Sequence, residues 1–431
     1  MNPGESRVDP RLRVVYLLVF ACGVFVLRDP RVLGTLALSQ AAAWMAVGLG
    51  GRRLARQVTK LWGFSTFVAV SYALTAEDPA IDRWVPLFGS KLSVNLGGLV
   101  VGLTMVLRIL AVVLASQVAR AGDPRSIAQG LSKLRVPTIV AASIDTVLAL
   151  LGDGERGGSG MGTGGGRGRG DGKGKGGGRG AEDGEGEGFF AAVKRLGRGD
   201  VGPVVKRIER QIARAERQAE SHVDDGAAGA FRDGAKARAV ARDVGVIAGI
   251  SLTMLGIKAL KVLPSVPFAP GHKLVVLTPL YVAARLLTNN RMGATLTGLT
   301  MGTVAFLLGD GKYGVFEIVK HVTPGIVCDL LVPVLTANGR EPGGAVWSAV
   351  GALIGACRFA TIFVVTFLVQ APKVAYAFLV PGITVHTVFG ALSGWVSYHL
   401  VRGLAHRRQG AVVVPDPSVS THDHDVSKES A

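Results

Sequence analysis

The feature that most constrains this chain is a series of apolar runs that approach or reach the length needed to cross a membrane. A helix needs about 20 apolar residues to span the hydrocarbon core of a bilayer. The runs fall into two groups, one on each side of a basic middle region. They occupy residues 14–27, 32–49, 61–76, 92–118, 244–262, 274–287, 294–308, 315–335, 345–369 and 374–401. They predict an all-α integral membrane protein with about ten transmembrane helices.

Positive charge next to the runs predicts how the chain is oriented. Residues 51–60, which we expect to form a loop, carry Arg52, Arg53, Arg56 and Lys60, whereas residues 77–91 mix acidic and basic side chains. Loops rich in Lys and Arg stay in the cytoplasm. We therefore expect a multi-pass protein of the cell membrane whose N-terminus is cytoplasmic. An even number of spans also returns the C-terminus to the cytoplasm.

The formal net charge of +17 does not by itself predict a nucleic-acid partner. Lys and Arg concentrate in loops, in the middle region and near the C-terminus, where they can meet anionic lipid headgroups or acidic protein surfaces. Cys22, Cys328 and Cys357 lie in apolar runs without Cys-x-x-Cys spacing. This pattern indicates neither a disulfide framework nor a metal site.

The middle region, residues 123–243, is expected to be cytoplasmic. It opens with Asp123-Pro124, a typical helix start, followed by apolar residues at helical spacing, Ile127, Leu131 and Leu134. Residues 152–188 are rich in Gly and charged residues, a composition that cannot bury enough apolar surface to fold. We interpret this segment as a disordered insertion. RNA binding by its Arg-Gly repeats is the alternative to a plain linker.

Two further helices are predicted after the insertion. The first begins at Pro203 and has an apolar stripe formed by Val204, Ile208 and Ile212, with arginines over much of the rest. The second begins near Ala227 and leads directly into the apolar run 244–262. The cytoplasmic region is thus expected to end in a membrane helix.

From residue 7 to about residue 264 the chain resembles the transmembrane T component of energy-coupling factor transporters, the family of the cobalt-type permeases. The resemblance rests on Val8-Asp9-Pro10-Arg11 before the first run, on Asp123-Pro124 through Val136-Pro137, and on two Ala-Arg-small motifs. These motifs are Ala213-Arg214-Ala215 and Ala237-Arg238-Ala239. In the family such motifs lie on coupling helices that dock into two ATP-binding cassette subunits.

The resemblance implies roles for individual residues. Arg214 and Arg238 would contact the ATPases, and Arg217 is an alternative to Arg214 because the motif fits one turn later as well. The competing interpretation is that these arginines lie on lipid headgroups. Arg108, inside the fourth run, resembles a family arginine and is expected to have a structural role.

The chain has no G-x-x-x-x-G-K-[ST] motif. We therefore expect a permease and not an enzyme, with no cofactor bound by this chain and with ATP bound by partner subunits. Separate S components are possible further partners under the resemblance.

The second half, residues 265–405, resembles a substrate-binding S component fused to the T-like part, which comprises residues 1–122, the cytoplasmic region and a fifth helix at 244–264. Charged residues inside its apolar runs are the candidates for a small-molecule pocket: Glu317, Lys320, His321, Asp329 and Arg358. Charges at membrane depth mark functional sites or pair with one another. An internal ion pair therefore remains the alternative. Residues 406–431, including His422-Asp423-His424-Asp425, are expected to be a disordered tail.

Four Gly-x-x-x-Gly pairs, at 98–102, 245–249, 298–302 and 351–355, permit close helix approach, either within the chain or between T and S parts. Taken together, the sequence predicts the membrane subunit of an ATP-driven importer of a vitamin-like small molecule. The alternatives are cobalt or nickel uptake by the same family, a membrane scaffold, and a membrane enzyme acting on lipids.

Overall fold

The computed structural model describes most of the chain outside its loops. The described residues are 9–27, 29–74, 80–86, 93–121, 126–134, 136–158, 202–222, 234–259, 274–308, 315–337, 342–369, 375–376 and 378–410. The greater part of the predicted Gly-rich insertion and of the C-terminal tail, with its His-Asp repeat, lies outside these residues.

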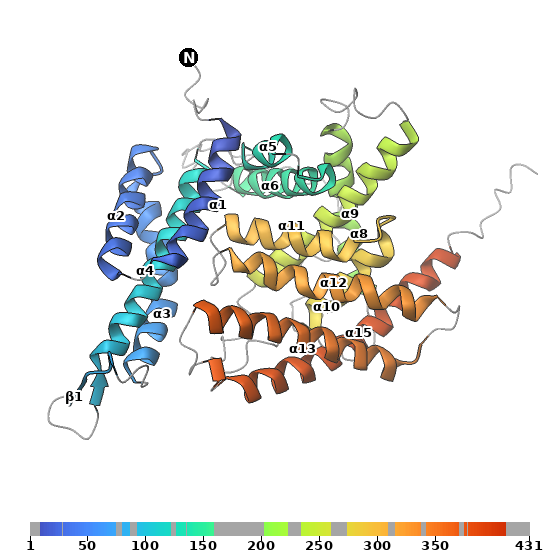
Figure 1. Ribbon diagram of the computed structural model, residues 1–431. Coiled ribbons are helices and arrows are strands. Elements are labelled where there is room, and N and C mark those ends of the chain that lie inside the picture. Colours follow the sequence, from blue (N-terminus) through green and yellow to red (C-terminus); the bar gives the residue numbers. More distant parts are fainter. Residues whose placement is uncertain are drawn as a thin grey trace, which may run out of the picture.

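Each of the ten predicted apolar runs contains a helix (Figure 1). The first group forms α1 (Pro10–Val26), α2 (Pro30–Ala46), α3 (Gly51–Ala73) and α4 (Leu96–Ala119). The second group forms α9 (Gly234–Ala259), α10 (Leu274–Leu287), α11 (Gly293–Leu307), α12 (Phe316–Thr336), α13 (Gly344–Val369) and α15 (Leu379–Gly410). Between them lie α5 (Ser126–Lys133), α6 (Thr138–Gly158) and α8 (Gly202–His222). The prediction of an all-α membrane protein is confirmed.

Five described helices are long and apolar enough to cross a membrane. They contain the segments Leu96–Ala119, Arg238–Lys258, Phe316–Thr336, Gly344–Phe367 and Leu379–Gly403. Three more apolar helical segments are shorter: Thr138–Leu151, Leu274–Leu287 and Gly293–Leu307. Length and composition thus support half of the roughly ten predicted spans within the described part of the chain.

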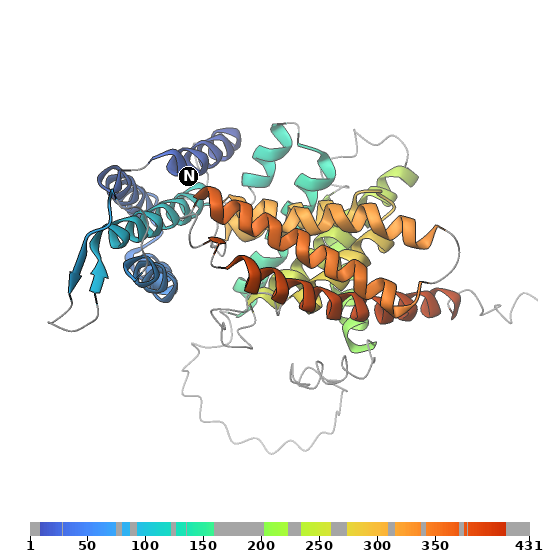
Figure 2. The same cartoon turned by 60° about the horizontal axis from the view of Figure 1, so that its bottom comes forward.

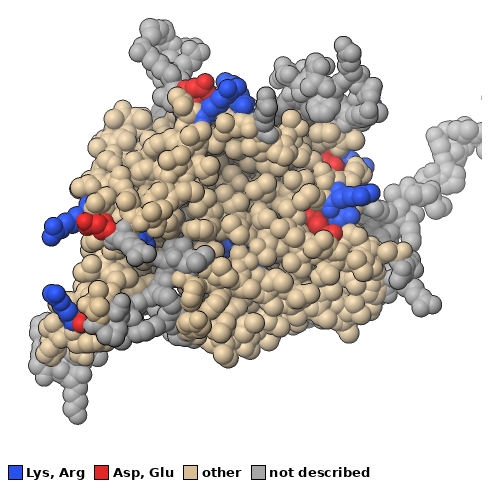
Figure 3. All heavy atoms as spheres, in the orientation of Figure 1, with Lys and Arg blue, Asp and Glu red and all other residues tan. Residues whose placement is uncertain are grey.

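The outer surface of the molecule has the character expected of a lipid-facing protein. Large apolar side chains are exposed on helices of both groups, including Leu18 of α1, Leu38 of α2, Leu330 of α12 and Val380 of α15. Figure 3 shows one face of the molecule, where charged residues gather at a few places near the edge and leave broad uncharged areas. Apolar patches of this extent mark a surface that is not in contact with water.

The structure corrects four local expectations. Residues 51–60, expected to be a loop, form the first turns of α3, because a helix tolerates exposed arginines on its surface. The predicted run 92–118 begins not with helix but with a short strand, β2 (Ser93–Asn95), which pairs with β1 (Trp84–Pro86) in an antiparallel hairpin. The first residues of the predicted insertion, 152–158, belong to α6, and the first residues of the predicted disordered tail, 406–410, belong to α15.

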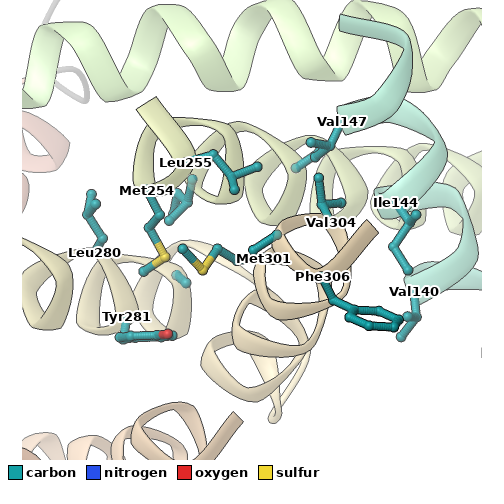
Figure 4. Packing of buried hydrophobic residues seen from close by; sticks show 14 of the residues in the cluster. Val140, Ile144, Val147, Met254, Leu255, Leu280, Tyr281, Met301, Val304 and Phe306 are labelled. Carbon is teal, nitrogen blue, oxygen red and sulfur yellow. The ribbon is translucent and has the colours of Figure 1, made fainter. Parts of the chain in front are cut away.

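The apolar segment of α6 was not predicted at all. It spans Thr138–Leu151, which is as long as some of the predicted runs, but it contains Asp145, lies in the basic middle region and is followed directly by a Gly-rich sequence. In the structure its Ile144 and Val147 are buried and face α9 and α11 (Figure 4). The helix belongs to the main hydrophobic core rather than to a cytoplasmic surface.

The Asp-Pro-Arg sequence at the first helix has a local physical reason. Asp9 accepts a hydrogen bond from the backbone N–H of Arg11 at 2.8 Å, and Pro10 occupies the first turn of α1. The same arrangement recurs at α2, where Asp29 accepts from the N–H of Arg31 at 2.8 Å. The tripeptide is therefore a helix start, whatever else it indicates.

The two helix groups run in different directions. In Figure 1, α1 and α4 run steeply, whereas α11, α12 and α13 run across the picture, and Figure 2 shows the same two groups from another side. They meet where Gln117 of α4 donates to the carbonyl of Leu308 at 3.1 Å and where the rings of Phe25 and Phe316 lie 5.2 Å apart. Most of the main core lies in the second group, with α6 and α8 packed against it.

All four Gly-x-x-x-Gly pairs serve helix contacts within the chain. A Cβ added at Gly98 would lie 2.1 Å from the Tyr72 carbonyl oxygen, and one at Gly298 would lie 2.2 Å from that of His321. Gly351 and Gly355 similarly face the backbone of α15, and Gly245 and Gly249 face that of α8. The intramolecular alternative is the one that the structure supports.

Candidate functional site

The predicted amphipathic helix is α8, and its two faces are as expected. Ile208, Ala215 and Ala219 are buried, and Ile212 packs against the same core. The arginines at positions 210, 214 and 217 are all exposed. Their spacing places these three side chains along one stripe of the helix. The arginine stripe is therefore available to an external partner.

The second predicted coupling motif lies on α9, which packs against α8 to form a hairpin. A Cβ added at Gly245 would lie 2.8 Å from the Glu216 Cα, and one at Gly249 would lie 2.8 Å from the Ile212 Cα. These contacts define an antiparallel pair. At 1.5 Å per residue, they place Arg214 and Arg238 about 13 Å apart along the hairpin axis.

Both motif arginines are exposed, and in the described part of the chain neither Arg214 nor Arg238 forms a hydrogen bond or an ion pair. Arg217, the alternative to Arg214, donates from Nε to the Ala213 carbonyl at 3.2 Å. Arg214 is thus the more accessible of the two candidates. Arg238 and the apolar segment that ends at Lys258 lie within one continuous helix, and this segment is long and apolar enough to cross a membrane.

A cavity of about 190 Å³ separates the α8–α9 hairpin from α10 and α15. Its walls are mostly apolar and include Ile212, Val246 and Leu287, while Glu216 and Arg242 supply charge. Burial raises the pKa of the Glu216 carboxyl above its usual value, the nearby Arg242 charge opposes this shift, and Glu220 adds to it. The hairpin is therefore not packed tightly against the bundle on this side.

Three of the five candidate pocket residues meet in one buried network. Glu317 is 1% exposed, and its Oε1 accepts from the Lys320 ammonium at 2.6 Å. His321 Nε2 lies 3.4 Å from the same oxygen, and Tyr281 Oη lies 3.1 Å from His321 Nδ1. Lys258 of α9 donates to this oxygen at 2.8 Å. The network thus joins α9, α10 and α12.

Asp329 lies away from the Glu317 network and has a different structural role. Its carboxylate accepts from the backbone N–H groups of Ala294 at 3.1 Å and Thr295 at 2.7 Å, and Arg285 Nε lies 3.7 Å away. It therefore caps the first turn of α11, where a negative charge is favourable. On α12 it lies about 18 Å from Glu317 at 1.5 Å per residue. The structure does not bring these two carboxylates together.

Arg358 of α13 is 9% exposed and lies near the network. Its charge acts on Lys320 and His321 of α12 and on His386 of α15. His386 Nδ1 lies 2.9 Å from the Gly382 carbonyl oxygen, a contact within its own helix. The inner face of α12 and the neighbouring part of α13 therefore form a polar region inside the bundle.

Arg108 has the structural contacts that were expected of it. Its Nη2 donates to the Leu27 carbonyl at 2.5 Å, and its Nη1 lies 3.4 Å from the Met105 sulfur. This ties the middle of α4 to the end of α1. The buried Arg13 makes a similar tie, donating to the carbonyl of Ala121 at 2.9 Å and to Ser126 Oγ at 3.0 Å.

The N-terminal third of the chain is similar to a known protein family. Residues 2–151 match the CbiQ family of cobalt transport proteins. The match supports a cobalt-transport-type membrane permease, in agreement with the resemblance to T components. No curated protein and no solved structure matches the chain.

The CbiQ match includes α1–α6 and ends at residue 151, the last residue of the apolar segment of α6. It thus covers Arg108, the Asp-Pro-Arg helix starts and the α6 helix that the sequence had not indicated. The α8–α9 hairpin with its arginines lies beyond the match, as does the whole of the C-terminal bundle α10–α15.

Three functional candidates emerge only from the structure. Lys258, Tyr281 and Asp243 are buried or half-buried polar residues, and each lies at or inside an apolar run. Lys258 and Tyr281 contact α12, and Asp243 contacts the turn between α10 and α11. Their position at membrane depth was the available signal. Within the described residues no group of three or more His, Cys, Asp and Glu side chains is arranged to hold a metal ion.

Proposed function

We propose that this chain is the transmembrane subunit of an ATP-driven, energy-coupling factor type importer. Two ATP-binding cassette subunits would dock on the α8–α9 hairpin, and the C-terminal bundle would bind a vitamin-like small molecule. The observation that carries the proposal is the hairpin, which presents Arg214 and Arg238 to solvent on helices that continue into the core.

Charge and geometry support docking at the hairpin. A guanidinium group can bond bidentately to a carboxylate, so an acidic groove on an ATPase is a suitable partner for each arginine. The separation of about 13 Å between Arg214 and Arg238 along the axis allows each to contact a different subunit. Because α9 is one helix from Arg238 to the core, movement at the docking site reaches the membrane part directly.

The arrangement of the two helix groups supports a bundle that reorients. If α4 spans the membrane along its normal, α12 and α13 lie across that direction in this conformation (Figure 1). Apolar helices in such a position would gain by turning toward the normal, where their length matches the bilayer. We infer that ATPase closure drives the bundle between these positions and thereby moves the solute.

The polar interior of α12 and α13 is the proposed solute site. Glu317, Lys320, His321 and Arg358 provide charged and hydrogen-bonding groups inside an apolar bundle, the combination found in sites for small polar molecules. Asp329 is part of the support of α11 and not of this site. The Glu317 contacts would have to open when the solute enters.

Cobalt or nickel uptake is the second candidate, and the match of residues 2–151 to a family of cobalt transport proteins favours it. The two candidates predict different uptake. Proteoliposomes that contain the complex should accumulate radioactive cobalt if the ion is the substrate. If they do not, while the purified chain retains a small organic molecule that mass spectrometry detects, the vitamin-like substrate is supported.

Purification from detergent-solubilised membranes tests the proposal. The wild-type chain should bring down ATP-binding cassette subunits, and the double variant Arg214→Glu with Arg238→Glu should lose them. Arg56→Glu, at an exposed arginine of α3, is the matched control and should retain them. Absence of an ATPase from the wild-type preparation, or equal association of the double variant, would refute the proposal.

A further inference from the structure

One buried carboxylate lies between the proposed docking arginines and the C-terminal bundle. Asp243 is on α9, about 7.5 Å along the axis from Arg238 at 1.5 Å per residue, and is 7% exposed. Its Oδ1 accepts from the backbone N–H of Asn289 at 2.9 Å and from the Asn289 side-chain amide at 3.4 Å. Asn289 belongs to the short turn that joins α10 to α11.

This turn is held from several sides. Thr288 Oγ1 donates to the Ala284 carbonyl at 2.7 Å, and Asn290 Oδ1 accepts from the Met292 N–H at 2.9 Å. Asp329 of α12 caps α11 directly after the turn. A displacement of the turn would therefore carry α10, α11 and α12 with it rather than deform the connection.

Further along, two other polar links join α9 to the same bundle among the described residues, at Ser251 and Lys258. Ser251 Oγ donates to the Thr297 carbonyl at 3.3 Å, and Lys258 Nζ lies 2.8 Å from Glu317 Oε1. The helix packs on α6, α8, α10 and α11. Of the three links, the one at Asp243 lies nearest to Arg238, and its acceptor is a charged group, which makes hydrogen bonds stronger.

We propose that Asp243 is the positioning residue that makes the α10–α11 turn move with the α8–α9 hairpin. This inference rests on the proposed function, because it assigns the route by which ATPase movement reaches the solute-binding bundle. In this role Asp243 acts through its hydrogen bonds to Asn289. It fixes the orientation of the bundle relative to the docking arginines.

Hydrogen exchange on the chain in detergent tests the tie itself. Asp243→Ala should speed exchange at the Asn289 amide by at least about tenfold, the effect of losing a hydrogen bond to a charged acceptor. Asp243→Asn should change it less, because its side-chain oxygen still accepts. Ser251→Ala, which removes another link between α9 and α11, is the matched control and should leave this amide unchanged. Unchanged exchange in Asp243→Ala would overturn the inference, whether or not ATPases bind.

Spin-label distances on the complex test the movement. In a background without the three native cysteines, labels at the exposed positions of Leu12 and Met292 report the turn relative to α1. Vanadate trapping of the co-purified ATPase subunits should shift this distance in the wild type. In Asp243→Ala the shift should fall by more than half while ATP hydrolysis persists, and Asp243→Asn should restore it.

The possible outcomes distinguish a failure of the proposed function from a failure of the role assigned to Asp243. No distance change in the wild type contradicts the proposed function, and the role of Asp243 falls with it. An equal change in wild type and Asp243→Ala contradicts the role of Asp243 alone, as does an equal loss in Ser251→Ala. If Asp243→Ala does not fold, Asp243→Glu replaces it, because the longer side chain keeps the charge but displaces the carboxylate from the Asn289 N–H.

Discussion

Lys258, near the end of α9, donates to Oε1 of Glu317 in the first turn of α12 at 2.8 Å. The same oxygen also accepts a hydrogen bond from the Lys320 ammonium, so a single carboxylate contacts two ammonium groups inside an apolar bundle. Removing one member of a buried charged group is costly because the remaining charges lose their compensation.

Glu317→Gln should therefore lower the free energy of unfolding by about 3 kcal/mol. Thermal unfolding in detergent measures the effect, and Glu220→Gln, at an exposed position of α8, is the control with little expected change. A double-mutant cycle with Lys258→Met should show coupling between the two residues. If the effects of the two substitutions on the free energy of unfolding are additive, the contact between the two side chains does not contribute to stability.

Arg108→Leu should destabilise the N-terminal helices by about 2 kcal/mol, because the Leu27 carbonyl loses a charged donor. Arg108→Lys should cost less, since its ammonium retains one donor for the same carbonyl. The fraction of protein that remains monodisperse after heating measures both. Arg31→Leu, an exposed arginine of α2, is expected to behave as the wild type.

Gly351→Ala should destabilise the α13–α15 pair by about 1 to 3 kcal/mol, the usual cost of overpacking. Its added Cβ would lie 2.2 Å from the Gly390 carbonyl oxygen, and that backbone cannot move away easily. Gly256→Ala is the matched control, since nothing lies within 4 Å of a Cβ there. The control should be neutral or slightly stabilising, as alanine favours helix. Equal melting temperatures for the two variants would contradict the close packing.

Glu216→Gln should stabilise the protein at neutral pH. Burial raises the pKa of Glu216 in the folded state, so ionisation of this group costs stability as the pH rises through the folded pKa. The cost is absent below the unfolded pKa of about 4.3, where wild type and variant should unfold alike. Melting curves at pH 7.5 and pH 4 give the comparison. A larger advantage at acid pH than at neutral pH would reverse the sign and refute this account.

The sequence predicted the elements better than their grouping. Long apolar runs located each helix of both groups, and Pro203 marked the start of α8, because these signals are local. The interaction of Glu317 with Lys320 and His321 followed from their spacing on one helix face. Lys258 and Tyr281 could not be added, since their contacts depend on how α9 and α10 pack against α12.

For Asp329, the sequence indicated that the residue is important but not what it contacts. An acidic residue inside an apolar run predicts a pocket or a partner, and the sequence cannot distinguish these. Its partner is the N-terminus of α11, a backbone feature that has no residue signature of its own. The short α6 was missed because its apolar segment contains Asp145 and is followed directly by Gly-rich sequence, although the structure buries it in the main core.

Native mass spectrometry of the wild-type complex, extracted from its own membrane, tests the central claim most directly. The account predicts a particle that contains this chain with two ATP-binding cassette subunits, and dissociation of both subunits in the Arg214→Glu, Arg238→Glu double variant. A particle without ATPase subunits, or one that the double variant leaves intact, would contradict the division of the chain into a docking hairpin and a solute-binding bundle.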